Sequence, residues 1–230
     1  MIKANDIEMV KLGGMTPEER ERYEKNKIEI NKKVSSLIAE ATKNAKLECC
    51  ILCSKPCSSF CNSHSIPQFA LKRIAEDGKV MLPLQDEILT IGKDTGVNKA
   101  GTFHIICRDC DSRTFQLYED PNAYNSKPTD QMLAQIALKD VLLMISKRNQ
   151  EREQYKLVGE QAEFLKDFAD EKIYLGDFDL RDYGEDLEYA RSSLDGRKSN
   201  RYYLCFYTVL DYVVPYVAQS SVTLISDFED

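Results

Sequence analysis

Apolar residues recur at helical spacing in the first part of the chain. Between residues 16 and 46 they follow one another three, four or seven positions apart amid dense charge, which predicts one apolar stripe on a helix. Thr16, Pro17 and Glu19 stand at its start in the order of an N-cap, a first-position proline and a capping-box glutamate. Residues 1–46 are therefore expected to contain an N-terminal amphipathic helix.

The middle of the chain has the patterns of short elements. Ser65 and Pro67 predict the cap and first turn of a short helix that ends near Gly78. A tight turn is expected at 94–96. Runs of β-forming residues predict strands at 80–82, 87–91 and 102–106.

The last part of the chain alternates between helical and β-like patterns. A helix rich in apolar residues begins at Thr129 or Asp130 and continues as a long charged helix to a break near Gly176. A further helix over 185–194 ends at Gly196. The β-like runs that follow cover 202–217 and 221–225.

These elements predict an α+β fold in four segments. They are an N-terminal helix, a cysteine-rich module, a long helical segment and an acidic α+β segment, at 1–46, 47–125, 126–175 and 176–230. Two strands alone make a poor sheet, so the last two runs either join strands elsewhere or belong to a larger domain of a longer protein.

Composition fits a globular protein and narrows its partners. The 230 residues are 43% hydrophobic, enough for one large domain or two modest ones. The net charge is −7, and residues 151–230 account for it with 9 basic against 18 acidic side chains. The cysteine region is near neutral, and no other segment of the chain has a strong excess of basic residues. The chain therefore lacks the basic surface that nonspecific DNA binding usually requires.

The N-terminal sequence and the longest apolar run predict a cytoplasmic protein with no membrane contact. No apolar signal-peptide core follows Met1. The run at 203–218 is interrupted by Asp211 and Pro215 and is shorter than the roughly 20 residues that a membrane-spanning helix needs.

Cysteine spacing is the strongest chemical signal. Eight cysteines in a reducing compartment point to metal rather than to disulfides. Cys50 and Cys53 form one Cys-x-x-Cys pair, and Cys107 and Cys110 form another. Two such pairs supply the four thiolates of a tetrahedral structural Zn²⁺ site.

Another metal site is possible within the same region. Cys57, Cys61 and His64 have spacings that would suit a local site, which would leave the second Cys-x-x-Cys pair half used. Cys49 and Cys205 are expected to be small buried hydrophobic residues.

The order of motifs resembles the zinc-containing HNH endonucleases over about residues 48–120. A first Cys-x-x-Cys pair is followed by Ser63-His64-Ser65-Ile66-Pro67, and a strand then leads to Cys107-Arg108-Asp109-Cys110-Asp111. The resemblance implies a zinc-stabilised treble clef with a ββα-metal element, flanked here by long helices.

The resemblance also implies residue roles. His64 would be the general base, and Asp111 would hold a catalytic Mg²⁺ or Mn²⁺. Ser63 stands where the family has an aspartate, so Asp109, Asp111 or another acid has to replace that carboxylate. The cationic residues expected to contact nucleic acid are Arg113, Lys72 and Arg73.

Two functions follow as hypotheses. The first is a metal-dependent nuclease that cleaves DNA, in the setting of bacterial or phage defence. The alternative is a noncatalytic structural-zinc module that binds nucleic acid or a protein partner. In either case the acidic C-terminal segment is a candidate surface for a protein partner.

Overall fold

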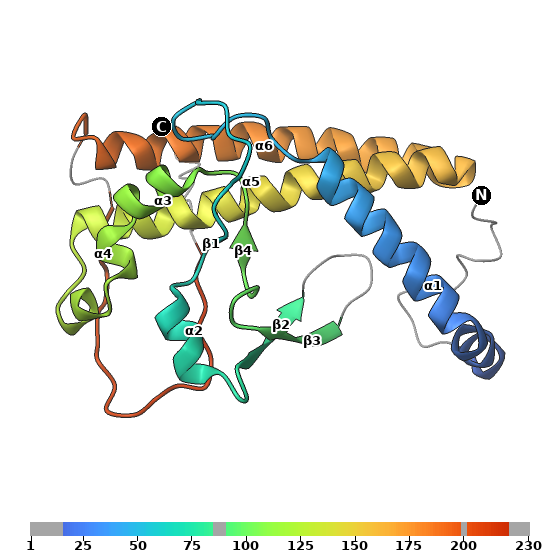
Figure 1. Cartoon of the computed structure of the whole chain (residues 1–230), viewed down its shortest axis with the longest axis horizontal. Coiled ribbons are helices and arrows are strands. Elements are labelled where there is room, and N and C mark those ends of the chain that lie inside the picture. The colour runs from blue at the N-terminus through green and yellow to red at the C-terminus, as the bar shows by residue number, and fades with distance from the viewer. Residues whose placement is uncertain (1–15, 85–90, 199–201, 221–230) are drawn as a thin grey trace, which may run out of the picture. The chain divides into compact units, whose positions relative to one another are not determined.

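The computed structural model describes residues 16–84, 91–198 and 202–220 (Figure 1). The chain divides into two compact units, and each takes residues from distant parts of the sequence. Unit 1 combines Met1–Lys46 with Lys147–Asp182, and unit 2 combines Leu47–Ser146 with Tyr183–Asp230. This division differs from the four consecutive segments expected from the sequence, because two long helices each contribute to both units.

Helix α1 (Pro17–Asn44) belongs to unit 1 and begins as the sequence predicts. The Glu19 backbone N–H donates to Thr16 Oγ1 at 3.2 Å, and the Thr16 N–H donates to Glu19 Oε2 at 2.8 Å. This reciprocal capping box satisfies two backbone donors that the helix itself leaves unpaired. The predicted N-cap, Pro17 at the first position and the helical segment are confirmed.

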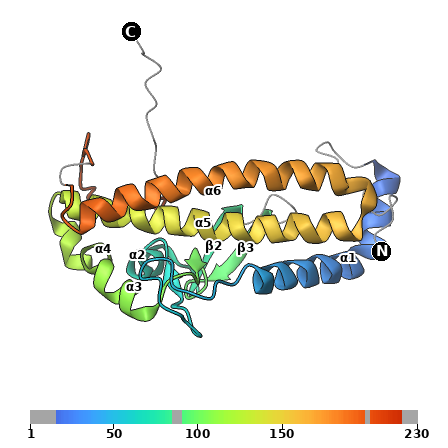
Figure 2. The ribbon, with the colours of Figure 1, turned by 90° about the horizontal axis from the view of Figure 1, so that it is seen from above.

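Two long helices, α5 (Asp130–Gln161) and α6 (Lys166–Leu194), are joined by the short 3-10 turn η4 (Glu163–Leu165). Figure 2 shows them as an antiparallel pair. The Met132 N–H donates to Thr129 Oγ1 at 3.2 Å, so Thr129 caps α5, as one of the two predicted candidates. Helix α6 ends before Gly196, whose φ of +76° places it in the left-handed region that favours glycine after a helix.

The predicted break at Gly176 is wrong, because Gly176 lies inside α6. Its hydrogen faces the arginines of α5: an added Cβ would lie 3.2 Å from Arg148 Cδ and 3.3 Å from Arg152 Cγ. Arg148 pairs with Asp179 at 2.8 Å and Arg152 pairs with Asp177 at 2.9 Å. The glycine therefore permits close helix packing within unit 1, and the chain turns at η4 instead.

Two small antiparallel sheets lie in unit 2. Strand β1 (Ser63–His64) pairs with β4 (Thr102–Phe103). Strand β2 (Lys79–Leu84) pairs with β3 (Ile91–Gly96).

The turn predicted at 94–96 is wrong, because these residues pair with 79–81 in the second sheet. The strand predicted at 80–82 is confirmed, since it lies within β2, and the strand predicted at 102–106 is present in part, as β4. Most of the strand predicted at 87–91 lies outside the described residues.

Helix α2 (Gln68–Ile74) starts later than predicted. Ser65 does not cap it: Pro67 stands at the N-cap position with no side-chain cap. The Ser65 N–H instead donates to the carbonyl of Gly101 at 2.9 Å, because Ser65 extends the line of β1 opposite the segment before β4. Leu71 of α2 packs with Val80 and Ala100 in one hydrophobic cluster.

Helices α3 (Arg108–Thr114) and α4 (Gln116–Glu119) follow β4, and the 3-10 helix η3 (Pro121–Asn125) leads toward α5. The largest buried apolar side chains of unit 2 come from β4, the segments around α3 and the first half of α5. They are Phe103, Ile106, Phe115, Leu138 and Leu142. The fold is thus mixed helix and small sheets, consistent with the expected α+β class.

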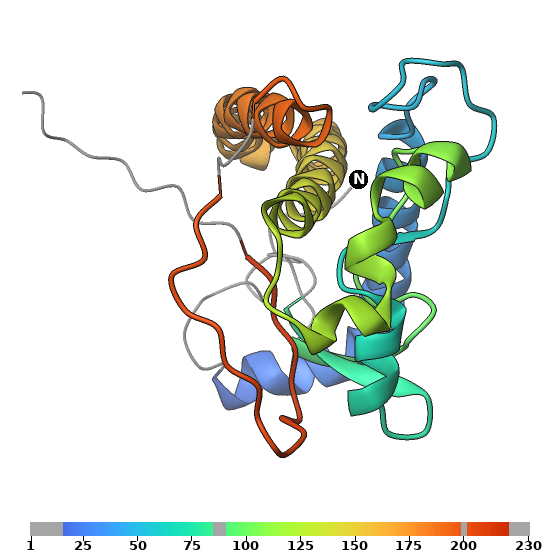
Figure 3. The same ribbon diagram turned by 90° about the vertical axis from the view of Figure 1, so that its left-hand side faces the viewer.

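The segment 202–220 contains no strand, so the predicted β-like run there is wrong (Figure 3). It has the β-forming composition, but it pairs with no strand among the described residues. Its end is held by side chains: Gln219 Nε2 donates to the carbonyl of Ile136 at 2.9 Å, and Val217 packs on the Leu71 cluster. The run predicted at 221–225 lies outside the described residues.

Across the part of the chain that the structure describes, no helix combines the length and apolarity needed to cross a membrane.

Candidate metal centre and the adjoining hollow

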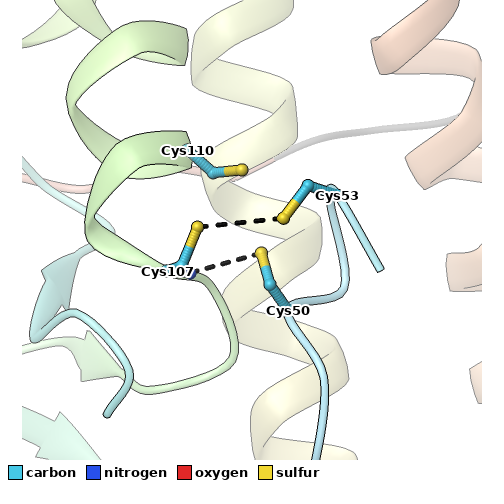
Figure 4. Close-up of side chains that lie close together, drawn as sticks. All are labelled: Cys50, Cys53, Cys107 and Cys110. Atoms are coloured by element: carbon cyan, nitrogen blue, oxygen red, sulfur yellow. Dashed lines mark hydrogen bonds between the residues drawn. The ribbon is translucent and has the colours of Figure 1, made fainter. Parts of the chain in front are cut away.

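Four cysteine side chains converge in unit 2 (Figure 4). Cys50 and Cys53 lie in a tight turn, Cys107 is the N-cap residue of α3, and Cys110 lies in the first turn of that helix. The four Sγ atoms lie within 4.8 Å of one another. The cluster consists of the two Cys-x-x-Cys pairs that the sequence predicts as one site.

Backbone hydrogen bonds bring these distant pairs together. The Ile51 N–H donates to the carbonyl of Ile105 at 3.0 Å, and the Cys61 N–H donates to the carbonyl of Ile106 at 2.8 Å. Ser54 closes the first turn with φ of +57°, and its N–H donates to the carbonyl of Cys50 at 2.8 Å. The turn is thus fastened to the segment that leads into α3.

The geometry suits a metal such as zinc. Cys53 Sγ and Cys107 Sγ lie 3.9 Å apart. Zn–S bonds of about 2.3 Å in a tetrahedron give sulfur–sulfur distances of about 3.8 Å. The Cys107 N–H donates to Cys50 Sγ at 3.2 Å, so the backbone at the start of α3 also holds this sulfur in place.

Burial raises the pKa of the Cys110 thiol above its ordinary range, and hydrogen bonds with Cys107, Cys53 and Cys50 raise it further. Four neighbouring thiolates repel one another, so a divalent cation is needed to hold them all deprotonated. The all-sulfur donor set is the one that Zn²⁺ takes in structural sites. If zinc is bound here, Cys50, Cys53, Cys107 and Cys110 are its ligands.

The local site considered for Cys57, Cys61 and His64 is wrong, because the four-thiol cluster is the only group of three or more potential ligands found among the described residues. Cys57 Sγ donates to the carbonyl of Ser59 at 3.0 Å, and Cys61 Sγ donates to Asp111 Oδ2 at 3.2 Å.

Cys49 and Cys205 are exposed, so the expectation that they are buried is also wrong. Cys49 lies at an isolated bridge with Pro56, and Cys205 lies in the segment that forms no strand.

His64 lines a surface hollow together with Asp111, which directly follows the cluster residue Cys110 in the chain. Its Nε2 is 2.9 Å from the carbonyl oxygen of Val97. If Nε2 carries the proton and donates it to Val97, Nδ1 is free to accept one. The hollow has a volume of about 370 Å³ and is lined by Asn62, His64, Pro67, Gln68, Phe69, Lys72, Asp111, Glu119 and Pro121.

Asp111 reaches the hollow but is already engaged. Its Oδ1 accepts the Ser63 hydroxyl at 2.5 Å and the Lys139 ammonium at 2.7 Å. Burial raises the pKa of the Asp111 carboxyl, but the charge and hydrogen bonds of Lys139, Ser63 and Cys61 bring the net pKa below its usual value. Asp111 is therefore a carboxylate held in an ion pair.

Lys139 is the functional residue that sequence reasoning missed. Its side chain is fully buried, and its Nζ lies 2.6 Å from Ser63 Oγ and 2.9 Å from Glu119 Oε1 in addition to Asp111. The ammonium also lies 4.1 Å from the centroid of the Phe115 ring. A lysine inside the apolar stretch 132–145 was the available signal, since a charge is almost never fully buried unless it is paired.

The remaining predicted site residues are on the surface. Lys72 and Arg73 are exposed on α2, and Lys72 alone of the two lines the hollow. Arg113 is exposed on α3, where its Nε donates to the carbonyl of Asp109 at 3.1 Å. The structure thus places Lys72 with His64 and Asp111, and does not place Arg73 or Arg113 in the lining.

Comparisons of the chain with protein-family models, with curated proteins and with solved structures found no significant match.

Proposed function

We propose that this chain is a zinc-framed nuclease of the HNH type, in which His64 activates water for attack on a DNA phosphodiester. The observation that carries the proposal is the surface hollow that gathers His64, Lys72, Asp111 and Glu119, with Asp111 directly after the cluster residue Cys110. A titratable base, a cation and carboxylates in one concave site are a combination typical of hydrolytic active sites.

A treble clef is proposed as the local fold. Its order of elements is a knuckle with Cys50 and Cys53, the β1–β4 pair, and helix α3 beginning at the second cysteine pair. This order supports the resemblance to HNH endonucleases, because the zinc ligands then flank the strand that carries His64.

In the proposed reaction the acting residues are those that line the hollow. His64 accepts a proton from water, the hydroxide attacks phosphorus, and the bond from phosphorus to the leaving sugar oxygen breaks. The leaving oxygen takes a proton from solvent. The ammonium of Lys72 attracts the phosphate and lies on the exposed side of the hollow.

The residues do not fit the catalytic Mg²⁺ or Mn²⁺ that the resemblance implies. Asp111 already accepts the Lys139 ammonium, and Ser63 donates its hydroxyl to the same carboxylate. A second cation would have to displace the ammonium or sit against its charge. No step of the proposed reaction therefore passes through a divalent metal.

The test is nicking of supercoiled plasmid DNA by the zinc-loaded protein, with Mg²⁺, with Mn²⁺ and with neither. His64→Ala should lower the rate by at least about 100-fold, the usual contribution of a general base. His104→Ala is the matched control, because His104 is exposed and does not line the hollow. Equal rates for the wild type and His64→Ala would reject the proposed nuclease.

A noncatalytic zinc module is the second candidate, and the engagement of Asp111 by Lys139 favours it. In that case the hollow binds a nucleic-acid phosphate without cleaving it. Lys72→Ala should weaken DNA binding, while Arg73→Ala on the same helix should not, since only Lys72 lines the hollow. DNA binding that depends on Lys72 without any cleavage would select this candidate over the nuclease.

A further inference from the structure

The ammonium of Lys139 has the surroundings of a bound cation. Its partners are oxygens from three elements: Ser63 of β1, Asp111 of α3 and Glu119 of α4. The distances from Nζ are 2.6, 2.7 and 2.9 Å. An ammonium has three N–H donors, so this set of three oxygens saturates it.

The rest of the environment also suits a positive charge. The Phe115 ring centroid lies 4.1 Å from Nζ and the Phe103 ring centroid 5.8 Å, so two aromatic rings add cation–π contacts to the three oxygens. The Lys139 side chain has no exposed surface, whereas the Glu119 side chain is 41% exposed and lines the hollow. The charge is thus fully buried, and two of its partners, Asp111 and Glu119, line the hollow.

We infer that the ammonium of Lys139 occupies the space in which Ser63, Asp111 and Glu119 would otherwise hold a divalent metal ion. Oxygen donors including two carboxylates are the ligands that Mg²⁺ and Mn²⁺ prefer. Here the same donors neutralise an ammonium that is covalently part of α5. The lysine therefore excludes a divalent ion in two ways: its positive charge repels the ion, and its side chain fills the space between the three oxygens.

The inference goes beyond the proposed nuclease, because it concerns ion binding and holds whether or not the hollow cleaves DNA. It also explains how Ser63 can stand in the position where the related motif has an aspartate. A third carboxylate would leave the single charge of Lys139 facing three negative groups, whereas a hydroxyl contributes an oxygen without charge.

The test measures Mn²⁺ binding to the zinc-loaded full chain by electron paramagnetic resonance, without substrate. The wild type is expected to bind no Mn²⁺ that depends on Asp111. Lys139→Ala should gain one Mn²⁺ site, at least about tenfold tighter than any nonspecific Mn²⁺ binding of the wild type. Adding Asp111→Asn to this variant should abolish the gain.

Lys147→Ala is the matched control, because Lys147 is an exposed lysine of the same helix and should leave Mn²⁺ binding unchanged. Lys139→Ser also leaves the space of the ammonium open and provides a second variant if Lys139→Ala folds poorly. A variant that folds poorly alone should regain its thermal transition when Mn²⁺ is added.

Three results would overturn the inference. They are wild-type Mn²⁺ binding that is lost in Asp111→Asn, folded Lys139 variants that gain no Mn²⁺ site, and unfolded Lys139 variants that Mn²⁺ does not restore. None of these depends on DNA cleavage. Loss of nicking in His64→Ala therefore remains a separate test of the proposed function.

Discussion

Asp111 joins three parts of unit 2 through its two carboxylate oxygens. Oδ1 accepts from Ser63 and Lys139, and Oδ2 accepts from the thiol of Cys61. Because Lys139 has no exposed surface, its charge depends on these partners for compensation. A carboxylate that the sequence suggests as a metal ligand is thus also a structural anchor between α3 and α5.

Replacing this carboxylate should destabilise the protein. We expect Asp111→Asn to lower the free energy of unfolding by about 3 kcal/mol, since removing one partner leaves a buried charge poorly compensated. Breaking a buried pair costs about 3–5 kcal/mol. Glu119 still contacts Lys139, so the expected loss lies at the low end of that range. Urea unfolding monitored by circular dichroism measures it.

Asp109→Asn is the matched control, since Asp109 is an exposed aspartate of the same helix and should change stability by less than about 0.5 kcal/mol. Equal unfolding free energies for the two variants would show that the Lys139 pair carries no net stabilisation.

Cys61 should react slowly with alkylating reagents. Burial, the hydrogen bond to Asp111 and the charge of that carboxylate together raise the pKa of its thiol to about 11. Thiolate is the reacting form, so alkylation should rise about tenfold per pH unit from pH 7 to 10 without reaching a plateau. Peptide mapping by mass spectrometry after timed iodoacetamide treatment measures this, and a plateau near pH 8.5 would contradict it.

At the level of residues, spacing predicted the thiol cluster and failed at the lysine. Cys50, Cys53, Cys107 and Cys110 could be paired because each two-residue spacing is a local constraint on one turn. The partners of Lys139 lie 20 to 76 positions away in the sequence. No local pattern encodes such a contact, because it forms only when β1, α3, α4 and α5 pack together.

Helix α6 contains two glycines in different surroundings. Gly184 has open space where a side chain would be, with nothing within 4 Å. Gly176 faces the side chains of Arg148 and Arg152, which their ion pairs hold in place. Gly184 therefore only lowers the helix propensity of α6, whereas Gly176 allows α6 to pack closely against the arginine side chains of α5.

Alanine substitution should separate these two cases. Gly184→Ala should raise the free energy of unfolding by up to about 1 kcal/mol, the gain in helix propensity. Gly176→Ala should gain less or lose stability, because its methyl group would press on the two arginine side chains. Thermal and urea unfolding of both variants measure the difference, and an equal gain would mean that the arginines shift at no cost.

At the level of elements, prediction succeeded where a local signal suffices. The capping box of α1 and the Thr129 cap of α5 are side-chain contacts within one turn, and both helices start where expected. Strands depend on partners: 202–217 has β-forming residues but stays unpaired, whereas 94–96 looks like a turn yet pairs with 79–81. Local sequence patterns therefore did not predict which segments pair as strands.

At the scale of the whole molecule, the thiol cluster lies entirely within unit 2. Its four ligands come from the turn at 50–53 and the start of α3, both in Leu47–Ser146. Unit 1 contains α1 and residues 147–182 and has no ligand in the cluster. Metal removal should therefore affect the two units unequally.

We expect one Zn²⁺ per chain by elemental analysis of protein purified without chelator. Removing it should open unit 2, because structural zinc contributes its binding energy directly to folding. Amide hydrogen exchange should then increase by at least tenfold in residues 47–64 and 102–114. The increase should be smaller in 17–44 and 166–182, whose hydrogen bonds lie within long helices.

Cys107→Ser should reproduce the effect of chelation without a chelator, since it removes the ligand at the N-cap of α3. Cys205→Ser is the matched control: Cys205 is exposed and lies outside the cluster, so its zinc content and exchange should equal those of the wild type. Full zinc content in Cys107→Ser would reject the four-thiol site. Uniform loss of protection in both units after chelation would instead show that the metal stabilises the chain as one cooperative body, since α5 and α6 contribute residues to each unit.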